Sequence, residues 1–342
     1  MPLGVLEAHS WARSPDPSPD PRTRNAKSLD EKESARWLQA LAVAGAAARR
    51  LPQTQMVVLA DREGDLYEMY DGCQTGPPNL HVVIRAQHNR QLEGHQKLWA
   101  FMATQPVGDR RTLNVPRRGA QSARTARVEI RWASITIQPP AVGPKKNWPP
   151  LTLQAIWVHE PAPPPGRKPL SWMLLTDLPV ETQSQAWEKV GWYCRRWGIE
   201  EWHRTLKSVC KVEQREFKSA RHLQRVLAFD LIMAWRVLAL LKLGRVLPQV
   251  PASLIYTPDE IKLLLCSQKK TCEPVSELTL QEANRMTAKL GGWLGRRGDG
   301  EPGAEVLAAG LRRLQDLVLG YRWHSPPPHR RSQRPEEVSR CV

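Results

Sequence analysis

The sequence predicts an α/β protein in which a parallel sheet is followed by an antiparallel β segment and then by a helical region. Compact apolar runs at Gln55–Ala60 and His81–Arg85 are separated by a helical stretch, and this order is typical of a parallel sheet. Residues Ala126–Ile137 alternate apolar and polar side chains, as a half-buried antiparallel strand does. From Thr182 to beyond Leu243 the pattern is helical.

The first part of the chain contains three further predicted elements. Residues 1–11 predict a short strand, and Ser28–Arg50 predict a helix. Four apolar residues of that helix share one face because their offsets are 0, 4, 7 and 11: Trp37, Leu41, Ala44 and Ala48. Asp61–Met69 predict a second helix with Asp61 as its N-cap.

The later elements follow from the same patterns. Leu151–His159 and Ser171–Thr176 predict strands that join residues 126–137 in an antiparallel insertion. The last hundred residues are mostly helical, with a glycine-rich break at Gly298–Gly303. A narrow apolar stripe recurs at spacings of 4, 3, 4 and 3: Leu307, Leu311, Leu314, Val318 and Tyr321. This stripe predicts either a coiled-coil-like seam between chains or packing within the monomer.

The charge balance favours a polyanionic partner. The chain has 342 residues with 50 Lys+Arg against 34 Asp+Glu, a net charge of +16. Seven arginines fall within 22 residues: Arg110, Arg111, Arg117, Arg118, Arg124, Arg127 and Arg131. Arginine suits phosphate contacts better than a role in solubility alone. A generic basic surface remains the alternative interpretation of the net charge.

Several protein classes are disfavoured. The most apolar stretch, Leu223–Leu243, carries four charged residues and predicts a core helix, not a membrane span. The N-terminus does not resemble a secretory signal. The six scattered cysteines lack a CxxC pair, so we expect reduced thiols in a cytoplasmic protein without a zinc site.

Two groups of residues can carry chemistry. Asp61 ends a predicted parallel strand, where open α/β sheets bind their ligands, although a helix cap explains it equally well. Tyr193, Arg196, Glu200 and Lys207 follow at offsets of 0, 3, 7 and 14. On one continuous helix these offsets place all four side chains within an arc of about 60°. The alternative is a solvated helix face with ion pairs between neighbouring turns.

These residues carry a resemblance to a known family. The gaps of 2, 3 and 6 residues between Tyr193, Arg196, Glu200 and Lys207 resemble the signature of DDE transposases of the insertion-sequence-four family, Tn-five type. Asp61-Arg62-Glu63 resembles the family motif that holds the second catalytic aspartate. Trp172 stands 21 residues before Tyr193, as a tryptophan does in that type. The resemblance extends over nearly the whole chain.

The resemblance implies a fold and a mechanism. The fold would be an RNase H-like core over residues 1–100, a β insertion and return strand over 101–180, core helices over 181–245 and a helical dimerisation region over 246–342. Asp61 and Glu200 would be two of three carboxylates that bind a pair of Mg²⁺ ions for phosphodiester hydrolysis and strand transfer in DNA transposition and recombination. The implied DNA contacts are Tyr193, Arg196, Lys207, Trp197 and Arg85, with Trp172 stacking on a flipped base. For Trp172 core packing is the alternative.

The chain departs from the family at its start. No segment matches the first core strands or the first catalytic aspartate, so the sequence predicts an N-terminally truncated, incomplete core whose third metal ligand is missing. We therefore expect cleavage to be lost and the edge of Gln55–Ala60 to be exposed. The expected partners are double-stranded DNA at transposon ends, in the bacterial nucleoid, and a second copy or a full-length transposase bound through the C-terminal helices. The alternatives are a non-catalytic dimerising fragment that inhibits full-length transposase and, less well supported, an RNase H-like nuclease without a role in transposition.

Overall fold

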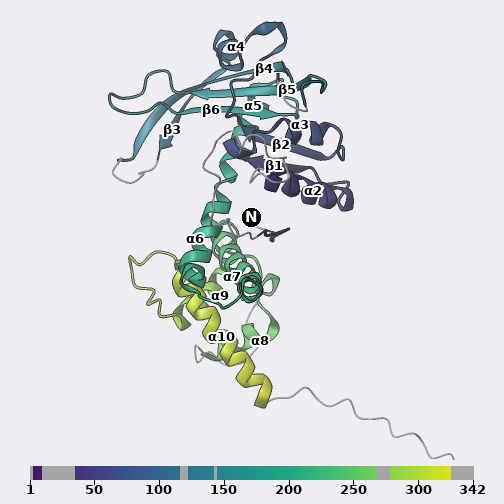
Figure 1. Cartoon of the computed structure of the whole chain (residues 1–342). Coiled ribbons are helices and arrows are strands. Elements are labelled where there is room, and N and C mark those ends of the chain that lie inside the picture. Colours follow the sequence, from purple (N-terminus) through teal and green to yellow (C-terminus); the bar gives the residue numbers. More distant parts are fainter. Residues whose placement is uncertain (1–2, 10–34, 116–121, 142–144, 268–277, 325–342) are drawn as a thin grey trace, which may run out of the picture. The chain divides into compact units, whose positions relative to one another are not determined.

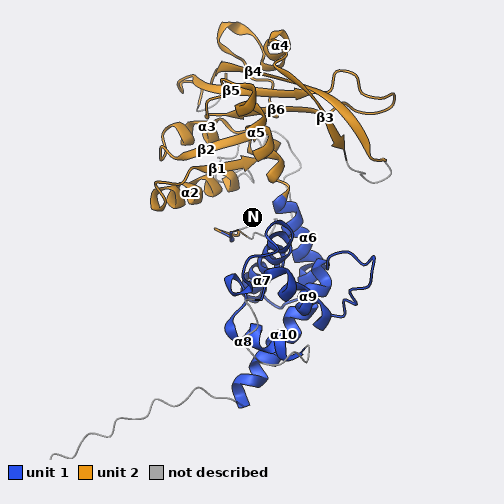
Figure 2. Ribbon diagram, turned by 180° about the vertical axis from the view of Figure 1, so that it is seen from behind, with its two compact units in different colours: residues 1–5, 198–342 blue, residues 6–197 orange. Residues whose placement is uncertain are grey.

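The computed structural model describes residues 3–9, 35–115, 122–141, 145–267 and 278–324. The chain forms two compact units (Figure 2). We call residues 6–197 the sheet unit, and residues 198–342 together with residues 1–5 the helical unit. Each unit has its own buried core.

The sheet unit is built on one mixed sheet, which has six strands within the described residues (Figure 1). The strands are β1 (Met56–Ala60), β2 (Leu80–Arg85), β3 (Asp109–Val115), β4 (Arg124–Ile137), β5 (Leu151–His159) and β6 (Ser171–Thr176). Their order is β1-β2-β6-β5-β4-β3. β1 and β2 are parallel, and all other pairs are antiparallel. The predicted parallel strands and the predicted antiparallel strands are therefore confirmed, and they belong to one continuous sheet.

Helices cover both faces of this sheet. They are α2 (Ala35–Arg50), α3 (Tyr67–Gln74), α4 (Leu98–Thr104) and α5 (Gln183–Arg195). α2, α3 and α4 contribute to one core, whereas α5 packs on the opposite face. The two faces alternate along each strand: on β6, Met173 and Leu175 enter the first core and Leu174 enters the second.

The helix predicted over residues 28–50 is confirmed from Ala35, and residues 28–34 lie outside the described part. Its predicted apolar face is buried at Leu41, Ala44 and Ala48, with Trp37 packed beside them. The strand predicted at the N-terminus is wrong, since residues 3–9 form neither strand nor helix. The helix predicted over Asp61–Met69 starts later than expected. Arg62–Gly64 form a 3-10 turn, and α3 begins only at Tyr67.

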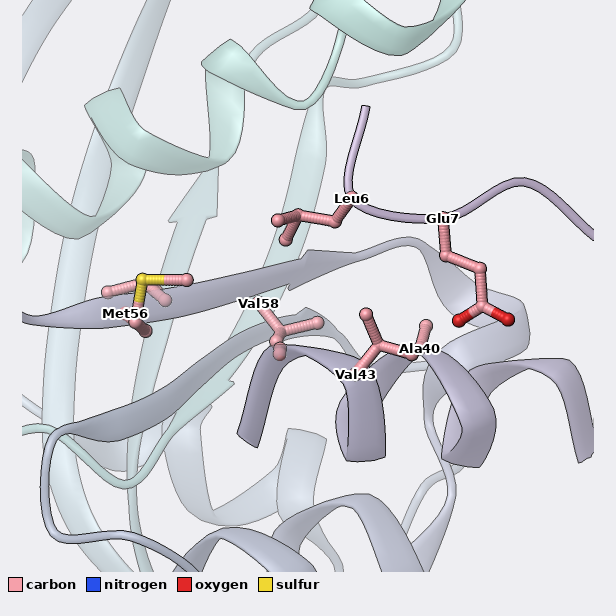
Figure 3. A pocket seen from close by; sticks show the side chains of 8 residues that line it. Leu6, Glu7, Ala40, Val43, Met56 and Val58 are labelled. Carbon is pink, nitrogen blue, oxygen red and sulfur yellow. The ribbon is translucent and has the colours of Figure 1, made fainter. Parts of the chain in front are cut away.

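The edge strand β1 pairs only with β2, so its second edge has no strand partner among the described residues. This is the exposed edge that the sequence predicted, and β1 (MVVLA) carries no charge that would discourage strand addition. Beside it lies an apolar cavity of about 290 Å³, lined by Leu6, Glu7 and residues of α2 and β1 (Figure 3). Its lining offers one carboxylate, on Glu7, and no basic side chain.

The helical unit contains α6 (Gly198–Cys210), α7 (Ala220–Val246), α8 (Pro258–Ser267), α9 (Leu280–Leu290) and α10 (Ala304–His324). Short 3-10 helices lie at Arg62–Gly64 (η2) and Glu93–His95 (η3) in the sheet unit, and at Val212–Gln214 (η4) and Ala252–Leu254 (η5) here. α9 and α10 meet backbone to backbone. A Cβ atom at Gly310 would lie 1.8 Å from the Thr287 carbonyl oxygen, and one at Gly291 would lie 1.8 Å from that of Val306. Only glycine allows this approach.

The stripe predicted on α10 packs within its own unit. Leu307, Leu311, Leu314 and Val318 are almost fully buried, and the first three belong to the core of the helical unit. The Tyr321 hydroxyl accepts a hydrogen bond of 2.8 Å from Lys262 of α8. The interpretation of these residues as a seam between chains is therefore wrong, because the monomer core already uses them.

Two further expectations concern location. None of the helices described is long and apolar enough to cross a membrane. Cys73, Cys194, Cys210 and Cys266 form no disulfide within the described residues, while Cys272 and Cys341 lie outside them.

Candidate nucleic-acid interface

Asp61 follows β1 directly and begins the turn η2. Its carboxylate accepts a hydrogen bond of 3.0 Å from the backbone N–H of Glu63, so it is a true N-cap. Glu63 forms an ion pair with Arg36 of α2. The sequence left a cap and a metal ligand open for Asp61, and the cap is the role that the structure displays.

Asp65 is the residue that ends the turn η2, and its side chain is fully buried. Its Oδ1 atom accepts hydrogen bonds from the Tyr70 hydroxyl at 2.8 Å and from Arg90 Nη2 at 2.6 Å. Its Oδ2 atom accepts from the backbone N–H groups of Gln87 at 2.7 Å and His88 at 2.9 Å. Arg90 also donates to the Asp65 carbonyl oxygen. The carboxylate thus ties the end of β1 to the end of β2.

The protonation of Asp65 follows from these partners. Burial alone would raise the pKa of this carboxyl, but the Arg90 guanidinium and the backbone N–H groups outweigh it and hold the pKa below its usual range. Both oxygens are already occupied by protein donors. Asp65 is therefore a structural ion-pair partner, and it cannot replace a missing metal ligand.

Arg85 ends β2 and lies among other arginines. Its guanidinium donates to the Ser171 carbonyl oxygen at 2.9 Å and to the Tyr193 hydroxyl. Burial lowers the pKa of Arg85, and repulsion from Arg62 and Arg196 lowers it further. We call Arg62, Arg85 and Arg196, with Tyr193 and Trp172, the arginine cluster.

The aromatic members complete this cluster. The rings of Trp172 and Tyr193 meet edge to face, with centroids 5.7 Å apart. The Arg196 guanidinium carbon lies 5.9 Å from the centroid of the Tyr193 ring. Trp172 is half-buried beside the core under α5, so it packs and also contacts the signature tyrosine. The cluster is assembled from the ends of β1 and β2, from β6 and from the end of α5.

The signature Tyr193–Lys207 does not lie on one continuous helix, contrary to prediction. α5 ends at Arg195 and α6 begins at Gly198. Between them the N–H groups of Arg196 and Trp197 bond to carbonyl oxygens three residues earlier, the tighter pattern of a 3-10 turn. Trp197 is exposed in this break. The two units also divide between Trp197 and Gly198. The prediction that one continuous helix holds all four side chains within an arc of about 60° is therefore wrong.

The second half of the signature belongs to the helical unit. Glu200 lies in the first turn of α6, and Lys207 lies in its last turn with a 2.6 Å ion pair to Glu213. His203 lies between them in the sequence. Its pKa is lowered, because the effects of burial and of Lys207 outweigh the opposite effect of Glu200. Glu200 and Lys207 thus flank one face of α6.

The predicted metal ligands Asp61 and Glu200 belong to different units, and their convergence stays a prediction. Nowhere in the described part do three histidine, cysteine, aspartate or glutamate side chains gather closely enough to hold a metal ion. Divalent cations such as Mg²⁺ prefer several oxygen ligands, and a catalytic pair needs them on both ions. The pair of Mg²⁺ ions therefore stays a prediction too.

Two features were missed from the sequence. Arg62 joins the cluster although the sequence singled out only its neighbour Asp61; its position directly after a strand-terminal aspartate was the available signal. The Asp65–Arg90 ion pair joins residues 25 positions apart, and no local sequence pattern predicts a contact over that distance.

The arginine cluster has the chemistry of an anion site. Arg62 and Arg196 both repel the Arg85 guanidinium, and a phosphate placed beside Arg85 would relieve that repulsion through charge-assisted hydrogen bonds. Trp172 and Tyr193 supply ring faces and edges against which a base could stack.

Residues 232–326 match the family model of the transposase Tn5 dimerisation domain. The match lies wholly within the helical unit, from the middle of α7 to just beyond α10. It supports a transposase-related protein of the Tn5 type, and a dimerisation domain supports homodimer formation.

Proposed function

We propose that this chain is a DNA-binding protein of the Tn5 transposase type, in the insertion-sequence-four family, that dimerises and grips transposon-end duplex DNA in the nucleoid. The observation that carries the proposal is the arginine cluster, in which Arg85 and Arg196 contact the signature tyrosine and Arg62 lies near Arg85. The match of residues 232–326 supports the dimeric, transposase-related part.

The phosphate backbone is the natural occupant of such a cluster. Arg85 is held in place by Ser171 and Tyr193, so its remaining N–H groups are pre-oriented for an anion. Arg196 extends over the Tyr193 ring and adds a second guanidinium. Because the positions of these donors are fixed before binding, little conformational entropy is lost when a phosphate arrives.

Catalysis is a separate matter. A cut-and-paste transposase of this type would use Asp61 and Glu200 as Mg²⁺ ligands, together with a third carboxylate. Asp65, four residues after Asp61, does not supply it, since its carboxylate is saturated by Arg90, Tyr70 and two backbone N–H groups. We therefore propose that the chain binds DNA ends without cutting them.

The test compares binding and cleavage on the same duplex. Fluorescence anisotropy should show salt-dependent binding of the full chain to a transposon-end duplex. The double substitution Arg85→Gln and Arg196→Gln should weaken it at least tenfold and lower the slope of log Kobs against log[salt] by about 2. Incubation with Mg²⁺ should leave the duplex uncut.

The matched control carries the same change in charge elsewhere in the sheet unit. Arg49 and Arg50 are exposed in the last turn of α2, and Arg49→Gln with Arg50→Gln should bind like the wild type. Equal weakening by both double variants would mean that only net charge matters and would refute the cluster. Mg²⁺-dependent cutting by the purified wild type would refute the non-cleaving part.

A second function is a dimerising inhibitor of full-length transposase. One observation favours it: the region that matches the dimerisation domain lies in a unit with its own core, so dimerisation does not need the chemistry of the sheet unit. Co-expression with an intact Tn5-type transposase should lower the frequency of transposition. An unchanged frequency at comparable protein levels would reject this function.

A further inference from the structure

We propose that the outer edge of β1 is a contact surface for a second copy of this chain, which adds its own β1 as an antiparallel neighbour strand about a two-fold axis. The proposal rests on the proposed function only through homodimer formation, and it places a contact in the sheet unit, outside residues 232–326. Four features carry it: the orientation of the backbone groups, the space beside the edge, the flank of α2 and the charges at the two ends of β1.

The backbone groups of this edge suit pairing with a second copy. β1 has no strand partner on this side among the described residues. The Met56 N–H donates to the Asn79 carbonyl oxygen on the β2 side, at 2.8 Å. Because backbone groups alternate between the two sides of a strand, those of Val57 and Leu59 point to the outer edge. A two-fold axis at Val58 places Val57 of one copy opposite Leu59 of the other, and such residues exchange hydrogen bonds in pairs.

The space beside the edge is a cavity and not packed protein. Its volume is about 290 Å³, and its lining comes from residues 6–7, from α2 and from β1 (Figure 3). Met56 and Val58 face the core under α2 but stay partly exposed, whereas Val82 and Ile84 of β2, on the same face, are fully buried. The side chains of a second β1 would occupy this cavity and complete the burial of Met56 and Val58.

The flank of α2 leaves room for the same helix of a second copy. α2 contributes only small side chains to the cavity lining, from Ala40, Val43 and Ala44. It packs against both β1 and β2. A helix centred between two strands stands about 2.4 Å inside the edge strand, so two α2 helices would lie about 9.6 Å apart across the pair. This separation falls within the roughly 8–10 Å between packed helices.

The two ends of this edge carry different charges because α2 runs antiparallel to β1. Arg36, in the first turn of α2, forms an ion pair with Glu63, which follows the end of β1. Arg49 and Arg50 are exposed in the last turn of α2, from which the chain leads into β1. Two positive charges therefore lie at the start of β1.

The other end of the edge is slightly acidic, and this favours the antiparallel direction. The charges of the neighbours Asp61 and Arg62 cancel there, and Glu7 adds one negative charge at this end of the cavity (Figure 3). An antiparallel pair brings Arg49 and Arg50 of each copy toward Glu7 of the other, at both ends. A parallel pair would instead bring four arginines side by side, and like charges at such positions are destabilising.

The contact needs the helical unit because β1 is short. β1 has five residues, whereas stable interfaces involve about 20–30 residues on each side. Homodimer formation, which the match of residues 232–326 supports, raises the effective concentration of the second edge. The β1 contact is therefore expected within an assembly that the helical unit holds together.

The test introduces single cysteines into the full chain and follows disulfide-linked dimers under mild oxidation. Val58 lies on the proposed axis, where opposed Cα atoms stand about 4.5 Å apart, so Val58→Cys should bridge two copies. Met56→Cys, on the same face of the same strand, is the matched control. In this register its two copies lie about 14 Å apart, so it should give at least tenfold less linked dimer, close to the background set by the cysteines of the wild type.

A second pair of variants checks the register. Met56 faces Ala60 of the other copy, so a mixture of Met56→Cys and Ala60→Cys proteins should bridge although neither does so alone. Equal bridging by Val58→Cys and Met56→Cys would indicate a parallel or non-specific contact and would overturn the proposal. Absence of bridging from both Val58→Cys and the mixture would overturn it too, and this is the result expected if the edge binds only a strand of a different protein.

Charge reversal checks the direction of pairing. In the Val58→Cys background, Arg49→Glu with Arg50→Glu should lower the yield of linked dimer at least threefold. Arg221→Glu with Arg225→Glu is the matched control, because these arginines are exposed on α7 outside the matched residues, and it should leave the yield unchanged. Equal effects of the two reversals would overturn the proposal.

Sedimentation of the reduced wild type separates this contact from the proposed function. A dimer whose Val58→Cys variant does not bridge would reject the β1 contact and keep the dimeric part of the proposed function. A monomer whose variant nevertheless bridges would reject that part and keep the β1 contact. A monomer without bridging would reject both.

Discussion

The sheet unit and the helical unit both bury an apolar core and an ion pair, but they place these interactions differently. In the helical unit, α9 and α10 are in direct backbone contact at Gly310 and Gly291, and the core is largely apolar. In the sheet unit, a buried ion pair between Asp65 and Arg90 joins the end of β1 to the end of β2, next to the candidate site residues Arg62 and Arg85. The helical unit also buries an ion pair, between Arg236 of α7 and Glu260 of α8. The comparison teaches that it is the fixing of strand ends, and not buried charge as such, that distinguishes the candidate DNA site.

The largest expected effect is a local loss of stability in the sheet unit. Asp65→Asn leaves the buried Arg90 without its counter-charge, and breaking such a pair costs about 3–5 kcal/mol. Hydrogen exchange measured by mass spectrometry should show faster exchange in residues 56–90 and no change in α9 and α10. Asp71→Asn on α3, which lacks this network, is the control. Equal loss of protection in both units would show that they do not unfold separately.

The same carboxylate predicts an acid-sensitive sheet unit. The folded-state pKa of Asp65 lies below its unfolded value, so the stability it contributes is present above pH of about 4 and is lost as pH falls through the folded pKa. Unfolding midpoints of the wild type should drop in this range, while those of Asp65→Asn should drop less. Parallel acid profiles for the two proteins would contradict the assignment.

A smaller effect is expected in the helical unit from Gly310→Ala. The new Cβ atom would clash with the Thr287 carbonyl oxygen and push α10 from α9, at a cost of about 1–3 kcal/mol. Gly320→Ala, on the same helix with open space around it, should instead stabilise by about 0.5–1 kcal/mol. Urea unfolding and sedimentation should show weaker dimerisation for the first variant only. The same shift in both variants would argue against close packing as its cause.

The smallest expected effect concerns the arginine cluster. Tyr193→Phe keeps the ring beside Trp172 but removes the hydroxyl that accepts from Arg85, a loss of about 1 kcal/mol. Hydrogen exchange should change near the end of α5 and β2 alone. A change that spreads into α10 would mean that the cluster also supports the helical unit.

The sequence predicted those parts of the fold whose pattern is local. β1, β2, β4, β5 and β6 follow apolar runs or alternation, and all are present. β3 was missed because Arg110, Arg111 and Asn114 hide its alternation, and α4 was missed because it is short. The N-terminal strand was wrong because a strand needs a partner that no sequence pattern guarantees.

Four of the predicted site residues lie close together, their role stays a prediction, and the predicted single helix face was wrong. Arg85, Tyr193, Arg196 and Trp172 do come together in the sheet unit. The single helix face failed because two residues with i→i−3 bonds divide α5 from α6. Helical periodicity assumes a continuous helix, and the sequence marks this break only by Gly198.

The free edge of β1 has a consequence for the protein in a cell. Within the described residues, β1 is an apolar strand with a strand partner on one side only, and such an edge can accept a strand from another chain. We therefore expect association through this edge to speed clearance of the protein and so to lower its steady-state abundance.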